Sequence, residues 1–333
     1  MCTAIVYGEG DGYFGRNLDL EYSYNECVAI TPRRYPLIFR RLPALKEHHA
    51  LVGIATVVDG HPLYYDAMNE KGLAMAALNF PESGWYAPDR EGAPASFEVL
   101  PWVLGQCATV DEAKQLLTGV VITDAAFSDR YPPTPLHWML TDGVRSLVIE
   151  PLREGVRLHE NPVGVLTNEP PFEAQLLGLR AHASLSAQPP HNRLAPPLDL
   201  HPFSKGMGAI GLPGDLSSPS RFVRAAFVKW NAVSGPTEEE RVAQFFHLLG
   251  AVAQPRGCNH TAEGYEITRY ASCCNLKQGL YYYATYDGNR VVGVDLHREA
   301  LDGTQPITYP LLERLPIFLQ NGNKVSVVKS SPL

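Results

Sequence analysis

The residue that suggests chemistry most directly is the cysteine at position 2. A small side chain after the initiator permits removal of Met1, and Cys2 would then carry a thiol and a free α-amine in one residue. The amine titrates at about pH 8 in model peptides, so it can accept the thiol proton without a histidine. This pattern predicts nucleophilic attack by sulfur on an acyl group. Position alone favours a simpler interpretation, a small buried hydrophobe, so the surrounding residues must decide.

Polar residues that could support such a nucleophile stand at Arg16, Asn17 and Asp19. The apolar run 3–7, the glycine-rich turn 8–12 and the run 13–19 predict a hairpin that brings this end back beside residue 2. Asp19 could hold the α-ammonium, and Arg16 could favour the thiolate. Positions 16 and 19 lie on opposite faces of an ideal strand, so both reach Cys2 only if the strand is irregular or ends there. The alternative is a surface ion pair.

The other cysteines allow a competing interpretation as a metal site or scaffold. Cys258, His260, Cys273 and Cys274 lie within a short stretch, but no C-x-x-C pair is present, and vicinal cysteines seldom ligate one ion together. The spacing therefore argues against zinc. The six scattered cysteines are also a poor disulfide framework in a chain of 333 residues without a predicted secretory signal.

Several pairs of apolar runs flank short turns, which predicts antiparallel hairpins. The pairs are 63–68 with 73–80, 137–141 with 146–150, and 280–286 with 290–295, and the run 51–58 is apolar enough to be covered on both faces. Helices are predicted in the middle of the chain, where Ser218-Pro219 and the capping box of Thr237 with Glu240 start two of them. Antiparallel sheets packed against helices therefore fit better than a doubly wound parallel sheet.

Residues 187–202 contain five prolines and can form neither a helix nor a central strand. The segment is either a linker between domains or an ordered excursion that reaches another subunit. Residues 206–211 match G-x-G-x-x-G, but no strand precedes them and Leu212-Pro213 follows where a helix should open. We interpret these glycines as positions of a tight turn or a close backbone approach.

Composition sets limits on partners and location. The net charge of −7 argues against nucleic acid and anionic membranes as partners, and no apolar run of about 18 residues predicts a membrane span. The absence of a secretory pattern predicts a cytoplasmic protein.

Ordered blocks along nearly the whole chain resemble the choloylglycine hydrolase family, which contains bile salt hydrolases and penicillin V acylases. The similarity starts with Met1-Cys2-Thr3 and the run 13–19, YFGRNLD. It continues through the blocks 66–73 (DAMNEKGL), 78–80 (LNF), 135–138 (PLHW), 161–168 (NPVGVLTN), 211–222 (GLPGDLSSPSRF), 245–247 (FFH) and 282–286 (YYATY). Each block is weak by itself, whereas their order is highly specific.

The resemblance implies an α+β fold, a four-layer αββα sandwich of antiparallel sheets, and a single N-terminal nucleophile hydrolase domain over residues 1–333. It implies a homotetramer assembled through the excursion at about 187–206, and a reaction without cofactor or metal. The implied catalytic residues are Cys2, Arg16, Asp19, Asn79, Asn168 and Arg221. The two asparagines would supply uncharged oxyanion donors, and Arg221, in the first turn of its helix where a cation is unfavourable, would polarise the thiolate.

The same resemblance places Leu18, Tyr24 and Tyr65 near a substrate pocket, although each could equally be an ordinary core residue. Asparagine at position 79 favours conjugated bile salts over penicillin V, because the penicillin V acylases of the family carry tyrosine there. Penicillin V acylase and acyl-homoserine-lactone acylase remain alternatives. The predicted reaction is hydrolysis of the amide bond of a glycine or taurine conjugate.

Overall fold

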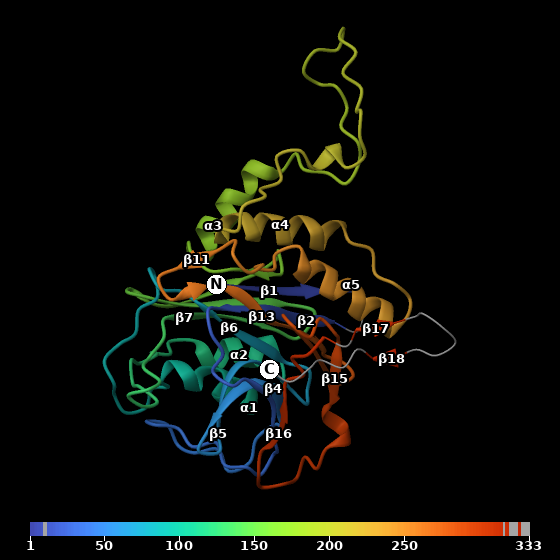
Figure 1. The fold of residues 1–333 in the computed structure, drawn as a ribbon. Coiled ribbons are helices and arrows are strands. Elements are labelled where there is room, and N and C mark those ends of the chain that lie inside the picture. Colours follow the sequence, from blue (N-terminus) through green and yellow to red (C-terminus); the bar gives the residue numbers. More distant parts are fainter. Residues whose placement is uncertain (9–11, 316, 320–325, 328–333) are drawn as a thin grey trace.

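The computed structural model describes residues 1–8, 12–315, 317–319 and 326–327. Two large antiparallel sheets form its centre (Figure 1). The first has six strands in the order β10 (Val165–Leu166), β1 (Cys2–Tyr7), β2 (Tyr13–Leu20), β13 (Ile267–Asn275), β14 (Leu280–Thr285) and β15 (Val292–Asp295). The second has eight, in the order β16 (Ile307–Pro310), β3 (Cys27–Thr31), β4 (Leu51–Val58), β5 (His61–Asn69), β6 (Ala74–Asn79), β7 (Leu136–Thr141), β8 (Ser146–Leu152) and β9 (Gly155–Glu160).

Helices cover the outer faces of both sheets. The six-stranded sheet packs against α4 (Ser218–Asn231) and α5 (Glu238–Gly250), and α3 (Phe172–Leu179) lies beside α4. The eight-stranded sheet packs against α1 (Val99–Gln106) and α2 (Val110–Leu117). Strands β1 and β2 face β5 and β6 across the space between the sheets. This is the predicted four-layer αββα arrangement, and it is confirmed.

The short elements complete the description. Two-residue strands form the ribbons β11 (His260–Thr261) with β12 (Gly264–Tyr265) and β17 (Phe318–Leu319) with β18 (Ser326–Val327). Single 3₁₀ turns lie at Ser96–Glu98, Arg180–His182, Met207–Ala209 and Leu296–Arg298. No helix in the described ranges is long and apolar enough to cross a membrane.

The predicted hairpins are present, and local chemistry explains them. The turn between β5 and β6 is held by the Asn69 side-chain oxygen, which accepts from the backbone nitrogens of Lys71 and Leu73. Such a carboxamide replaces backbone partners in a tight turn. Strand β4 is buried along most of its length, as its apolar run predicts. The predicted turn between β1 and β2 falls largely on residues 9–11, which lie outside the described part.

The start of α5 also follows its sequence signal. Thr237 caps the helix by accepting from the Glu240 nitrogen, and the Glu240 carboxylate accepts from the Thr237 nitrogen. Helix α4 begins at Ser218 with Pro219 in its first turn, which brings Arg221 inward under the sheet. The two helix starts thereby fix the layer that closes over β1 and β2.

The proline-rich segment projects from the body of the molecule as an arm, which we define as residues 184–206 (Figure 1). No strand and no helix occurs within it. Its base is pinned where the Ser186 nitrogen donates to the Gly208 carbonyl, and a side chain at Gly208 would come within 1.9 Å of the Gln188 oxygen. The G-x-G-x-x-G segment is therefore a site of close backbone approach. No strand leads into it, and a 3₁₀ turn occupies its centre.

Candidate active site

Cys2 is the first residue of β1 and is almost fully buried, with 3% of its surface exposed. It pairs with Leu18 of β2, while Ala4 pairs with Arg16. Paired residues of an antiparallel ladder share a face, so Cys2, Leu18 and Arg16 all lie on the side of the sheet that faces β5 and β6. The hairpin thus brings the thiol and the guanidinium together, as its sequence predicts.

Arg16 approaches the sulfur directly. Its Nη2 donates to Cys2 Sγ at 2.5 Å, and its Nη1 donates to the carbonyls of Tyr65 (3.2 Å) and Ala77 (2.5 Å). Burial acts to lower the pKa of Arg16, but Cys2, Tyr270 and Asp66 oppose this and leave the pKa raised. The guanidinium therefore stays charged next to the thiol, which favours the thiolate.

Asp19 lies on the face of β2 opposite to Arg16, and it interacts with the chain terminus next to Cys2. Its Oδ1 accepts from Thr268 Oγ1 at 2.6 Å, and its backbone oxygen accepts from the Met1 ammonium at 3.0 Å. Burial raises the pKa of Asp19, and the chain terminus and Arg221 act against that. The strand therefore need not be irregular, because Arg16 reaches the side chain of Cys2 while Asp19 faces the chain terminus.

Asn168 holds the backbone nitrogen of Cys2. Its Oδ1 accepts from that nitrogen at 2.8 Å and from Arg221 Nη2 at 2.8 Å. Its Nδ2 donates to the Asn79 carbonyl at 2.7 Å. We predicted a donor to an oxyanion, whereas this geometry first orients the future α-amine and engages one amide hydrogen with Asn79.

Arg221 contacts the backbone at the nucleophile, and its predicted role in polarising the thiolate stays a prediction. Its Nη1 donates to the Cys2 carbonyl and to Thr3 Oγ1, each at 2.6 Å. Burial lowers the pKa of Arg221, against the opposing effects of Asp19 and Cys2. Arg221 fixes the peptide backbone at the nucleophile and aligns Asn168.

A cavity of about 300 Å³ opens at Cys2. The predicted substrate residues Leu18, Tyr24 and Tyr65 all lie on its wall, as does Asn79. Sequence reasoning missed the rest of the wall, which comes mainly from β5 and the segment 127–136: Leu20, Thr56, Leu63, Tyr64, Ala77, Ser96, Phe97, Phe127, Arg130, Tyr131, Pro132, Thr134 and Leu136. The wall is mostly apolar and aromatic, which suits an apolar acyl group.

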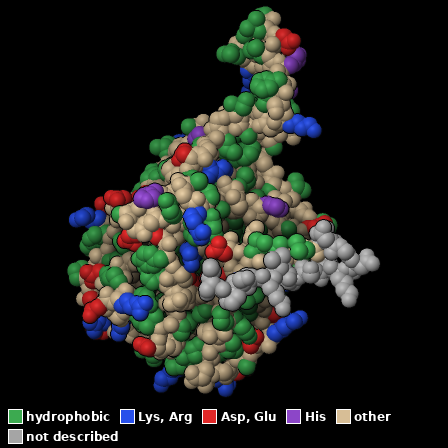
Figure 2. Space-filling model, viewed as in Figure 1, with side chains coloured by type: hydrophobic (Ala, Val, Ile, Leu, Met, Phe, Trp, Pro, Cys, Tyr) green, Lys and Arg blue, Asp and Glu red, His purple; other side chains and the backbone are tan. Residues whose placement is uncertain are grey.

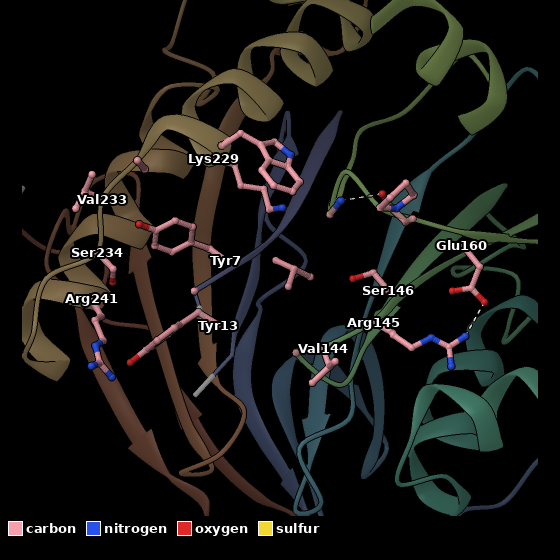
Figure 3. A pocket seen from close by; sticks show the side chains of 18 of the residues that line it. Tyr7, Tyr13, Val144, Arg145, Ser146, Glu160, Lys229, Val233, Ser234 and Arg241 are labelled. Atoms are coloured by element: carbon pink, nitrogen blue, oxygen red, sulfur yellow. Dashed lines mark hydrogen bonds and ion pairs between the residues drawn. The ribbon is translucent and has the colours of Figure 1, made fainter. Parts of the chain in front are cut away.

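A larger cavity of about 930 Å³ lies at the other end of β1, beside Tyr7 and between α4 and the turn that joins β7 to β8 (Figure 3). Cys2 and Tyr7 are separated by five residues of strand, or roughly 17 Å. Burial lowers the pKa of Lys229 in this cavity to about 8, and its ammonium donates to the Val163 carbonyl at 2.7 Å. No cysteine lines it. The cavity of about 300 Å³ at Cys2 is therefore the one in which a thiol can attack an acyl group.

The residues of the alternative metal site do not converge. Cys273 and Cys274 are buried in β13, whereas Cys258 and His260 are exposed. No group of three or more potential metal ligands occurs among the described residues.

Comparison with known proteins shows the family of the chain. The family model of the linear amide C–N hydrolases, choloylglycine hydrolase family, matches residues 2–309. A bile salt hydrolase/transferase of Lactiplantibacillus plantarum is 48% identical over 96% of this chain and 100% of its own length. A bile salt hydrolase/transferase of Clostridium perfringens is 36% identical over 95% of this chain and 99% of its own length.

Solved structures give the same result. The Cys2→Ala mutant of the conjugated bile acid hydrolase from Clostridium perfringens superimposes with a TM-score of 0.88, at 34% identity over 96% of this chain and 100% of that one. A penicillin V acylase from Agrobacterium tumefaciens shares the fold, with a TM-score of 0.74 and 22% identity over 93% of this chain and 91% of that one. The fold and the matched family model place this chain in the class of amidases that act on linear amides. Within that class, the chain belongs to the choloylglycine hydrolase family.

Proposed function

We propose that this protein hydrolyses the amide bond of glycine- or taurine-conjugated bile salts. The observation that carries the proposal is a buried thiol at Cys2, contacted by Arg16 and placed at an apolar, aromatic cavity. Relatives that match this chain over nearly its whole length are bile salt hydrolases. Removal of Met1 would turn the nitrogen held by Asn168 into a free amine beside that thiol.

The reaction would use these groups in sequence. The Cys2 amine accepts the thiol proton, directly or through a water, and the thiolate adds to the amide carbonyl. Asn79, which lines the cavity, and the remaining amide hydrogen of Asn168 would bind the oxyanion that forms. The ammonium returns its proton to the leaving nitrogen, which releases glycine or taurine and a thioester. Water then hydrolyses the thioester and regenerates Cys2. No step requires a cofactor or metal.

Arg16, Asp19 and Arg221 would support this sequence without bonding to substrate. Arg16 favours the thiolate, Asp19 faces the ammonium, and Arg221 holds the Cys2 carbonyl and Asn168. Leu18, Tyr24 and Tyr65 would contact the steroid body. The cytoplasmic location stays a prediction, supported by a nucleophile that must remain reduced and by six cysteines that are all free.

Substrate preference provides the direct test of the proposal. Conjugated bile salts should be cleaved with at least about tenfold higher kcat/KM than penicillin V, because a rigid steroid gains more from a broad apolar wall than a flexible phenoxyacetyl group does. Both substrates are measured side by side at equal ionic strength. A preference for penicillin V would overturn the substrate assignment and leave the thiol mechanism standing.

A pair of neighbouring tyrosines supplies a matched control for that experiment. Tyr24 lines the cavity, whereas Tyr22, two residues earlier, does not and is 47% exposed. Tyr24→Ala should lower kcat/KM for a conjugated bile salt, whereas Tyr22→Phe, which keeps the ring beside Tyr24 and removes only a hydroxyl, should change it much less. Equal losses in both variants would argue that the loop, and not the cavity wall, governs binding.

We also infer that residues 1–333 form one domain and that the arm assembles the protein into a homotetramer. Both ends of the chain contribute to the six-stranded sheet, since β2 pairs with β13, which supports a single domain. The arm carries large exposed hydrophobic side chains, which Figure 2 shows at the end of the projection. They are Leu194, Leu198, Leu200 and Phe203. Prolines keep such a segment stiff, which reduces the ordering cost at an interface.

Shortening the arm should therefore dissociate the assembly with little effect on the fold. Deletion of residues 189–202, or the double change Leu194→Ser with Phe203→Ser, should give a smaller species in sedimentation velocity, with the melting temperature of the monomer nearly unchanged. Val233→Ser is the matched control, because Val233 is equally exposed (84%) but lies outside the arm. An unchanged oligomer, or a wild type that is monomeric, would refute the assembly role.

A further inference from the structure

A buried carboxylate joins the two sheets close to the active site. Asp66 of β5 is 1% exposed and receives hydrogen bonds from three hydroxyl groups of the facing sheet. Tyr270 donates to Oδ1 at 2.5 Å, and Tyr281 (2.6 Å) and Ser272 (3.0 Å) donate to Oδ2. Three donors and no side-chain acceptor is the arrangement that stabilises the ionised form.

Asp66 acts on the same guanidinium as the nucleophile does. Arg16 interacts electrostatically with Cys2 and with Asp66, and its backbone nitrogen donates to Ser272 Oγ at 3.2 Å. Burial keeps the pKa of Asp66 above its usual value, although Arg16 and the three hydroxyls act to lower it. One buried cation thus interacts with two potential anions: it contacts the sulfur of Cys2, and its residue is connected to Asp66 through the Ser272 hydroxyl.

Other charged and titratable groups surround Cys2, Arg16 and Asp66. The α4 residue Arg221 holds the Cys2 carbonyl, and the chain terminus pairs with Glu266 in the unprocessed chain. Asp19 of β2 and Tyr270 of β13 complete the set. With Met1 removed, two arginines and an ammonium face the Cys2 thiolate and the buried carboxyl groups of Asp19, Asp66 and Glu266. The thiolate therefore shares these cations with buried carboxyl groups, and Asp66 is one of them.

We propose that Asp66 is a positioning residue for the reaction: its charge competes with the Cys2 thiolate for Arg16 and keeps the thiolate from being overstabilised. Overstabilisation is harmful because the nucleophilicity of a thiolate falls as its basicity falls. Arg16 itself does not depend on Asp66 for its position, because the carbonyls of Asn17, Tyr65 and Ala77 hold it. Removing the Asp66 charge therefore leaves Arg16 in place, and the Arg16 guanidinium then stabilises the Cys2 thiolate more strongly.

The test is the pH dependence of Cys2 alkylation by iodoacetamide in the processed enzyme, followed by the mass of the N-terminal peptide so that other thiols do not contribute. Asp66→Asn should move the midpoint of the alkylation rate to lower pH by about one unit. It should also lower the rate at the high-pH plateau about threefold, as the Brønsted dependence of thiolates requires for one unit. Alkylation requires no turnover, so the result is independent of whether the proposed substrate is correct.

A control variant and a second background keep the test decisive. Tyr281→Phe removes one hydrogen bond to Asp66 but no charge, so it should lower the melting temperature without moving the midpoint. If Asp66→Asn alone does not fold, the comparison of Tyr281→Phe with Tyr281→Phe/Asp66→Asn replaces it, because the phenylalanine removes a hydroxyl that would otherwise face the new amide group. Arg16 is kept in both proteins, and the midpoint of the double variant should lie below that of Tyr281→Phe. An unchanged or higher midpoint in either comparison would show that Asp66 is only a link between the sheets.

Discussion

Replacement of Cys2 by serine should lower kcat for a conjugated bile salt on the order of 1000-fold or more, because a hydroxyl is a far weaker nucleophile than a thiol at neutral pH. Serine is close in size to cysteine, so the buried position at the start of β1 should accept it and the fold should persist. The measurement is steady-state hydrolysis by a Cys2→Ser protein whose N-terminus has been verified by intact mass.

Cys258 supplies the control for that experiment. It is an exposed cysteine outside both cavities, so Cys258→Ser should retain full activity. A near-normal rate in correctly processed Cys2→Ser would contradict thiol catalysis. Loss of activity in Cys258→Ser as well would point to a general requirement for reduced cysteines instead of a specific nucleophile.

Blocking the N-terminus should abolish activity even though the thiol is present. In the chain that retains Met1, the Cys2 nitrogen is an amide nitrogen, whose lone pair is delocalised into the carbonyl and cannot accept a proton at neutral pH. An extension ahead of Cys2 that a site-specific protease can remove should therefore lower kcat by at least about 100-fold, the usual contribution of a general base. Cleavage to expose Cys2 should restore it.

The two states of that protein differ only at the amine, so each acts as the control for the other. N-terminal sequencing and intact mass establish the fraction processed, and activity should rise in proportion to it. Full activity with the extension in place would contradict the role of the amine, whatever the identity of the substrate.

Much of the fold could be predicted because its signals are local. The turn at Asn69, the cap at Thr237 and the helix start at Ser218-Pro219 each depend on residues within four positions of one another. The pairing of β2 with β13 is different, because it joins segments about 250 residues apart and no local pattern specifies it. The family resemblance, and not the spacing of residues, supplied the order of the layers.

The site was predictable in its members and less so in its geometry. Cys2 and Arg16 meet because a hairpin register places them on one face, which a sequence can indicate. The contacts of Asn168 and Arg221 with the Cys2 backbone depend on how α4 packs on β1, and their residue types fit several roles equally well. Asp66 is the first residue of the family block 66–73, but its proposed role depends on hydrogen bonds from three hydroxyls of the other sheet, which no local pattern indicates.

The pairing of the first strands with the last ones has a consequence for how the protein is made. Strand β2 cannot find β13 until residues 267–275 have been synthesised, which at about 5–20 residues per second comes roughly 10–50 s after the hairpin itself. Throughout that interval the N-terminus lacks the neighbours that later enclose it, and a peptidase can reach Met1. Once the chain is complete, only 3% of the surface of Cys2 is exposed. A peptidase therefore reaches Met1 most easily during synthesis, although Met1 stays partly exposed in the complete chain, and truncated chains that lack β13 carry a cysteine without an active site.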